Sequence, residues 1–127
     1  MRPKFRAWDV LAEEMINEIL MISFVRKEII GKFSDGSTSV PLKFEDKRNG
    51  EDVVLMQSTG LKDKNGVEIF EGDIVRFFDS LYTVFYDIKE GCYRLKPHDD
   101  RWVVDYMCNF SSEESFEVVS NIYETKE

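Results

Sequence analysis

The sequence is poor in the residues that most often carry chemistry. It has two cysteines, Cys92 and Cys108, and one histidine, His98, among 127 residues. Two cysteines are too few for the disulfide framework of a small secreted protein. The series Cys92-x5-His98-x9-Cys108 lacks the fourth ligand and the tight paired spacing that a structural zinc site needs. We therefore expect no catalytic residues, no cofactor-binding residues and no metal ligands, with His98 in a solvated loop.

Motifs for nucleotide binding, membrane spanning and export are also absent. Neither a Gly-rich run ending in Lys-Ser/Thr nor a G-x-G-x-x-G occurs. The most apolar stretch, residues 16–25, is interrupted by polar residues and is too short to span a bilayer. The charged start of the chain is not followed by a signal-peptide pattern. We therefore expect a cytoplasmic protein, with reduced thiols and no membrane partner.

Positive charge is scarce in the second part of the chain. The net charge is −8; residues 1–52 hold nine Lys and Arg against ten Asp and Glu, and residues 53–127 hold eight against fifteen. Binding to a phosphate backbone depends on Lys and Arg displacing counterions. Nucleic acid is therefore an unlikely partner for the acidic part, although a local basic patch stays open as an alternative.

Short segments rich in Val, Ile, Phe and Tyr alternate with turn signals along most of the chain. This pattern predicts a mainly β fold with several short strands. In the second part we expect strands over 53–57, 67–70, 74–78, 81–88, 92–95 and 116–123. A partly open SH3-like barrel would hide their apolar face and protect the sheet edges. The prediction is a β-rich subdomain over residues 1–52 and the barrel over 53–127, with the charged loop 45–52 as the boundary.

Two short segments have specific local predictions. Asn65-Gly66 is a pair that tolerates positive φ at both centres of a tight hairpin turn. Residues 10–20 fit either a helix capped by Asp9, which would make the fold α+β, or a hairpin. Residues 21–25 and 29–33 look like strands and count against the helix, but from the residues alone both alternatives stay open.

Two groups of side chains have both a functional and a structural interpretation. Glu68, Glu71 and Asp73 could form an acid–base pair in a cleft, but they flank Gly72, where acidic residues are ordinary turn formers. Trp8 follows the basic residues Arg2, Lys4 and Arg6 and could stack on a single-stranded nucleic acid. We favour the structural interpretation for both groups, with Trp8 in a core covered by basic side-chain stems.

Aromatic residues crowd the expected barrel. Strand alternation places about half of such side chains outward, where they can bind a peptide, another protein or a second copy of the chain. They are Phe77, Phe78, Tyr82, Phe85, Tyr86, Tyr93 and Trp102.

Three stretches of the chain resemble a known family: Lys4–Asp9, Leu55–Val75 and Glu117–Glu124. In order and placement they are similar to the YopX family of bacteriophage and prophage proteins. The resemblance implies a β-rich protein with an SH3-like C-terminal barrel and implies no reaction. It also favours the hairpin for residues 10–20, although Val10, Leu11 and Ala12 stand where the family usually has a polar turn. Its motif residues are expected to be structural: Trp8, Asp9, Gly60, Leu61, Asp63, Gly66, Glu71, Gly72, Asp73, Asn121, Ile122 and Tyr123.

The functional expectation follows from an acidic, aromatic-rich barrel without a catalytic constellation. We expect a phage or prophage accessory protein that is not an enzyme and that binds or assembles with a protein of the host or phage, or with itself. The alternative is a nucleic-acid-associated protein that uses the basic N-terminal strand.

Overall fold

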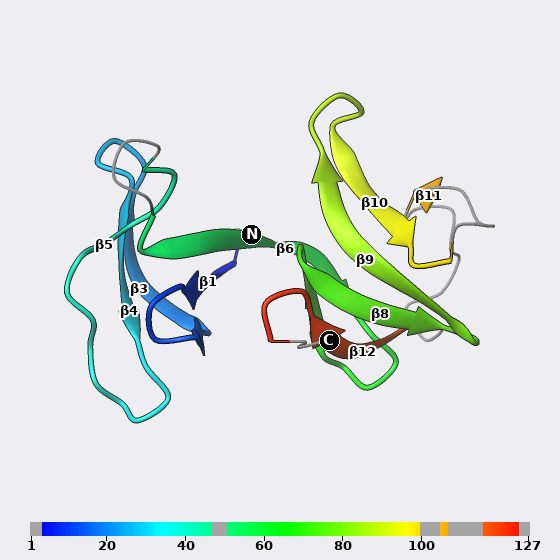
Figure 1. Cartoon of the computed structure of the whole chain (residues 1–127), viewed down its shortest axis with the longest axis horizontal. Helices are drawn as coiled ribbons and strands as arrows, with labels where there is room; N and C mark the ends of the chain where they lie inside the picture. The colour runs from blue at the N-terminus through cyan, green and yellow to red at the C-terminus, as the bar shows by residue number, and fades with distance from the viewer. Residues whose placement is uncertain (1–3, 47–50, 100–104, 107–115, 125–127) are drawn as a thin grey trace. The chain divides into compact units, whose positions relative to one another are not determined.

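The computed structural model describes residues 4–46, 51–99, 105–106 and 116–124, and in these residues the regular structure consists of strands alone (Figure 1). The predicted mainly β fold is therefore confirmed. Within the described residues there is also no helix long and apolar enough to cross a bilayer. The chain divides into two compact units, Met1–Gln57 and Ser58–Glu127. The division falls inside one strand, five residues beyond the boundary expected between residues 52 and 53.

The first unit contains two small antiparallel groups of strands. Its strands are β1 (Phe5–Asp9), β2 (Glu14–Ile16), β3 (Glu18–Ser23), β4 (Glu28–Lys32), β5 (Leu42–Lys43) and the first half of β6 (Val53–Lys62). β1 lies between β2 and β6, and β4 lies between β3 and β5. The core of this unit is formed by Ala7, Ile16, Ile29, Phe44 and Val53.

Residues 10–20 contain the loop and second strand of the β1–β2 hairpin and the start of β3, and no helix, so the hairpin that we favoured is correct. Asp9 pairs with Glu14 across a four-residue loop, in which the Asp9 carboxylate accepts a hydrogen bond from the Ala12 amide at 2.9 Å. Glu13 closes the loop with a φ of 53°. The apolar residues that suggested a helix, Val10 and Leu11, are exposed in this loop because β1 and β2 fill the core from their own strand positions.

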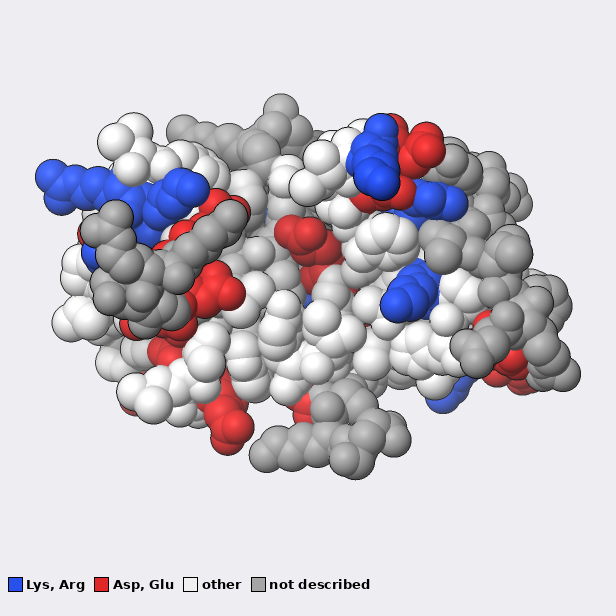
Figure 2. All heavy atoms as spheres, turned by 45° about the horizontal axis from the view of Figure 1, so that its top comes forward, with Lys and Arg blue, Asp and Glu red and all other residues white. Residues whose placement is uncertain are grey.

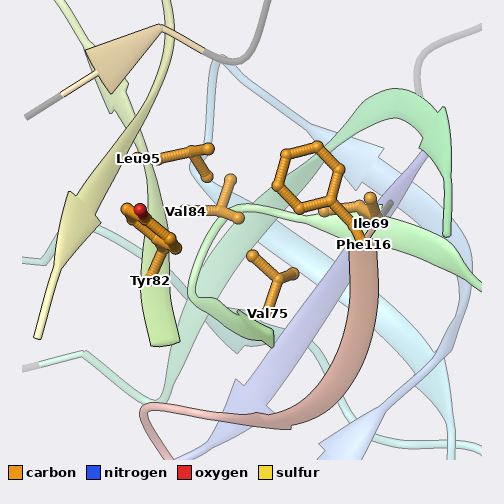
Figure 3. Packing of buried hydrophobic residues seen from close by; sticks show 6 residues of the cluster. All are labelled: Ile69, Val75, Tyr82, Val84, Leu95 and Phe116. Carbon is orange, nitrogen blue, oxygen red and sulfur yellow. The ribbon is translucent and has the colours of Figure 1, made fainter. Parts of the chain in front are cut away.

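The second unit is a curled, partly open half-barrel. Its strands are the second half of β6, β7 (Glu68–Phe70), β8 (Asp73–Phe77), β9 (Ser80–Asp87), β10 (Cys92–Pro97), β11 (Asp105–Tyr106) and β12 (Phe116–Asn121). The main sheet has the order β11-β10-β9-β8-β12, so the last strand returns to pair with β8. Figure 3 shows the core that fills the curl, which consists of Ile69, Val75, Tyr82, Val84, Leu95 and Phe116.

The turn between β6 and β7 differs from the predicted one. Only Gly66 of the Asn65-Gly66 pair has positive φ, at 81°. The loop is wider than a two-residue turn, because the Asp63 amide bonds to the Val67 carbonyl and the Gly66 amide bonds to the Asp63 carbonyl. A turn closed by one left-handed glycine satisfies this longer loop, so Asn65 does not need the left-handed conformation.

Candidate functional site

Asp63 is the polar centre of the second unit. Its side chain is buried, with 4% of the residue exposed. One carboxylate oxygen accepts hydrogen bonds from the amides of Asn65 and Val67, both at 2.8 Å, and the other accepts one from the Val118 amide at 2.9 Å. The carboxylate therefore joins the β6–β7 loop to β12, and its lone pairs are used by the backbone.

The pKa of Asp63 follows from these contacts. Burial, the largest single influence, acts to raise the pKa of the carboxyl. The hydrogen bonds from Val118, Val67 and Asn65, together with the positive charge of Lys64, outweigh burial and hold the pKa below its ordinary value of 3.8. Asp63 is therefore an ionised structural group at neutral pH.

The Glu71-Gly72-Asp73 turn is also fixed by backbone contacts. The buried Asp73 carboxylate accepts a hydrogen bond from the Phe70 amide at 2.8 Å. Gly72 has a φ of 88°; its amide donates to the Val84 carbonyl, and its carbonyl accepts from the Ile122 amide. Asp73 is thus part of the turn, and its contacts with the backbone support the structural interpretation of this acidic group.

Glu71 influences the pKa of Tyr93, which lies in β10. Burial raises the pKa of Tyr93, and the negative charge of Glu71 and the presence of Tyr86 raise it further. The Tyr93 hydroxyl donates to the Ser58 carbonyl at 3.2 Å, and its ring lies edge-on to Tyr86 at 5.1 Å. These contacts keep Tyr93 neutral as a hydrogen-bond donor to the second half of β6.

The C-terminal motif residues form a turn of their own. The Asn121 side-chain oxygen accepts hydrogen bonds from the amides of Tyr123 and Glu124, at 3.0 and 2.9 Å. Leu61 packs against the core of the half-barrel, and Gly60 adopts a φ of 83°. Asn121 and Gly60 therefore lie in turns, and Leu61 contributes to the packing of the half-barrel core.

Trp8, at the end of the basic N-terminal stretch, lies inside a sheet, whereas Arg6 pairs with β6 alone. Residues Ala7–Asp9 of β1 pair with β2 on one side and with β6 on the other. Arg6 is buried, Trp8 is half-buried and Lys4 is exposed, while Arg2 lies outside the described residues. Of the described residues of this stretch, Lys4, Arg6 and Trp8 do not form one open face, which weakens the nucleic-acid alternative.

His98 and the cysteines show no metal-site geometry in the described residues. His98 is exposed, and its Nε2 lies 2.8 Å from the Thr83 hydroxyl. Cys92 begins β10, whereas His98 follows the end of that strand, so the strand separates them by roughly 20 Å. Cys108 and Trp102 lie outside the described residues. The part of the chain that the structure describes contains no group of three residues suited to hold a metal ion.

The expected aromatic crowd is divided between core and surface. Tyr82 is buried in the core, whereas Tyr86 and Phe78 are exposed. Phe78 stands out because it occupies the first position of the two-residue loop between Phe77 and Ser80, with a φ of 55°. This conformation is uncommon for a bulky residue, and two-residue hairpin loops usually place glycine, asparagine or aspartate there. The sequence pattern placed this turn one residue later, at Asp79-Ser80.

Phe78 is connected to the core by a row of aromatic rings. Its ring centroid lies 4.5 Å from that of Phe77, and the Phe77 ring lies 5.3 Å from that of the buried Phe116. Phe78 itself is 78% exposed. A side chain placed in this way presents apolar area at a hairpin tip, beside rings that lead to the core, which suits an anchor for a protein partner.

Charged side chains are mixed on the face seen in Figure 2. Acidic and basic groups alternate with uncharged surface, and the basic side chains form separate small groups rather than one continuous track. Within each unit, the described Lys and Arg side chains visible in this view form no stripe of the kind that nucleic-acid binding uses.

Comparison with known families identifies the chain. A family model described as YopX protein matches residues 4–127. The chain belongs to the YopX family. This YopX-family chain is also similar to a solved structure, the crystal structure of protein EF1440 from Enterococcus faecalis, with 30% sequence identity and a TM-score of 0.63. The match covers 98% of this chain and 95% of the other. No curated protein matches the YopX-family chain.

Proposed function

We propose that this YopX-family chain is a phage or prophage accessory protein that acts without catalysis, by binding another protein through the β8–β9 hairpin tip. The hairpin tip is defined here as Phe77, Phe78 and Asp79. Its central residue is an exposed aromatic side chain on a sheet whose interior is filled by a well-packed core.

The conformation of Phe78 is the observation that carries the proposal. A left-handed backbone costs a non-glycine residue on the order of 1 kcal/mol, and such costs collect at functional sites. The local rule for this loop favours Asn, Asp or Gly, yet the sequence has Phe. The left-handed backbone thus costs stability at a position that exposes an aromatic ring, and binding of a partner by that ring explains why phenylalanine stands there.

The polar motif residues support the same conclusion. Asp63, Asp73 and Asn121 each accept hydrogen bonds from backbone amides, which commits their side chains to holding turns together. Among the described residues, several large apolar side chains are exposed at hairpin tips and on sheet faces. Apolar area of this kind is used for contacts between proteins.

The test is affinity capture with two matched variants. Tagged wild-type protein, Phe78→Asn and Ile88→Asn are exposed to lysate of the bacterium that carries the gene, and retained proteins are quantified by mass spectrometry. Ile88 is the control because it is also apolar, 87% exposed and located in a hairpin loop of the same unit. We expect a partner that wild type and Ile88→Asn retain and that Phe78→Asn loses by tenfold or more.

Retention of the same proteins by all three forms contradicts the proposal. Retention of none by the wild type contradicts it as well. Thermal unfolding of each variant shows that a loss of binding does not come from a loss of folding.

A further inference from the structure

A second apolar surface lies on the first unit, on the outer side of β3 and β4. The inner side is fixed by the core: Ile19 and Ile22 pack against the buried cluster, and Ile29 is part of it. Gly31 also faces inward, because a Cβ added there would collide with the Ile16 side chain. Since side chains alternate along a strand, Glu28, Ile30 and Lys32 must face outward.

The register of β3 and β4 completes this outer surface. Met21 pairs with Ile30, and Glu18 pairs with Lys32. A bulge between Ile19 and Met21 turns Leu20 outward beside Met21, and these two side chains are 51% and 56% exposed. We define the β3–β4 outer face as Glu18, Leu20, Met21, Ile30 and Lys32.

The free edge of β3 is a poor docking site by comparison. Within the described residues β3 is the terminal strand of its sheet. A bulge disrupts the regular row of amides and carbonyls that another strand would need, and bulges are a common protection of sheet edges. The apolar side chains therefore favour contact through the face of the sheet rather than through its edge.

The charges of this face are complementary to themselves. One exposed acid, Glu18, and one exposed base, Lys32, lie side by side at the same end of the apolar group. A two-fold axis parallel to the strands, between β3 and β4, places β3 of one copy over β4 of the other. Glu18 of each copy then faces Lys32 of the other, and Met21 of each copy faces Ile30 of the other.

We propose that the β3–β4 outer face binds a second copy of this chain and forms a two-fold symmetric dimer. An isologous contact requires one patch that complements itself, which this combination of apolar centre and opposite charges provides. Burial of Leu20, Met21 and Ile30 drives association, and the two Glu18–Lys32 contacts fix the orientation. This dimer is independent of the Phe78 hairpin tip, which lies in the other unit.

Mixing charge-reversal variants tests the orientation. In a dimer of the Glu18→Lys variant, each of the two charge contacts would join two bases. In a dimer of the Lys32→Glu variant, each would join two acids. Each variant alone should dimerise less than wild type, whereas a mixture should form heterodimers in which both contacts join opposite charges. Multi-angle light scattering and sedimentation equilibrium, from micromolar to millimolar concentration at low salt, report the masses, and a tag on one variant identifies the heterodimer.

Met21→Glu and Val25→Glu test the apolar part. Val25 is 96% exposed in the β3–β4 loop and lies off the face, so it is the matched control. We expect the dimer dissociation constant to rise tenfold or more for Met21→Glu and to change little for Val25→Glu. A wild-type chain that stays monomeric, with or without another protein bound to this face, overturns the proposal. A mixture of charge variants that associates no better than either alone also overturns it.

Discussion

At the scale of single residues, Asp63 shows how a buried charge can serve the fold. Three backbone amides donate to its carboxylate, so replacing it leaves buried donors without partners. Asp63→Asn keeps one acceptor oxygen and places an amide group toward one of the donors. We expect the free energy of unfolding to fall by about 2 kcal/mol, measured by urea denaturation at pH 7. Asp35→Asn is the control, because the Asp35 side chain is exposed and should contribute much less.

The contribution of Asp63 to stability should also depend on pH. The pKa of Asp63 is lowered in the folded state, so its stabilising effect is complete above the unfolded pKa of about 3.9 and is lost as the pH falls through the lower folded value. The difference in unfolding free energy between wild type and Asp63→Asn should therefore be constant from neutral pH to about 5 and shrink below about 4. Urea midpoints over that range measure it. A difference that stays constant at acid pH would contradict this account.

The left-handed backbone of Phe78 leads us to expect an unusual effect of mutation on stability. Asparagine accepts the left-handed conformation that Phe78 adopts at a φ of 55°. We expect Phe78→Asn to be as stable as wild type or more stable, by up to about 1 kcal/mol, in thermal or urea unfolding. Phe78→Ala loses the ring contact with Phe77 and keeps the backbone cost, so it should be the less stable variant. The reverse order would show that the loop is not strained.

At the scale of elements, the contact between β4 and β2 is unusually close. A Cβ at Gly31 would meet the Ile16 side chain, so Gly31→Ala forces one strand to move. The expected loss of stability is about 1–3 kcal/mol, the usual cost of overpacking a core. Combining it with Ile16→Ala should cost less than the sum of the two single changes, because the smaller side chain makes room. Additive losses in urea denaturation would contradict a direct contact.

The sequence predicts strands better than it predicts their junctions. Val, Ile and aromatic segments between turn signals located most strands of the half-barrel, because strand pattern and burial agree there. The prediction of positive φ at both Asn65 and Gly66 is wrong. The Asp63 side chain shapes that loop by accepting hydrogen bonds from the amides on either side of Gly66, those of Asn65 and Val67. The outward turn of Leu20 depends on a bulge that follows from pairing with β4, and no local pattern contains that information.

At the scale of the whole molecule, net charge and strand placement act together against nucleic-acid binding. The chain carries a charge of −8, and Arg6 is buried at a position where β1 pairs with β6. Titration of the protein into a fluorescently labelled single strand should leave the anisotropy unchanged at about 0.15 M salt. Binding that persists there, and that disappears on Lys4→Glu without loss of folding, would support the alternative.

Candidate binding surfaces were only partly visible in the sequence. The aromatic residues of the half-barrel stood out, but composition could not separate the buried Tyr82 from the exposed Phe78. Their separation requires the register of β8 and β9, which places the loop at Phe78-Asp79. The β3–β4 outer face was not predicted, because Glu18 and Lys32 become neighbours only when the hairpin forms.

The bond between Asp63 and Val118 has a consequence during protein synthesis. The two residues are 55 positions apart, so the ribosome completes the β6–β7 loop long before it adds the amide that this carboxylate needs. Until then one oxygen of Asp63 faces water, and β8 lacks β12 along one side. A nascent chain that stops before residue 116 therefore cannot close the half-barrel. Emergence of β12 from the ribosome is the event that completes this unit.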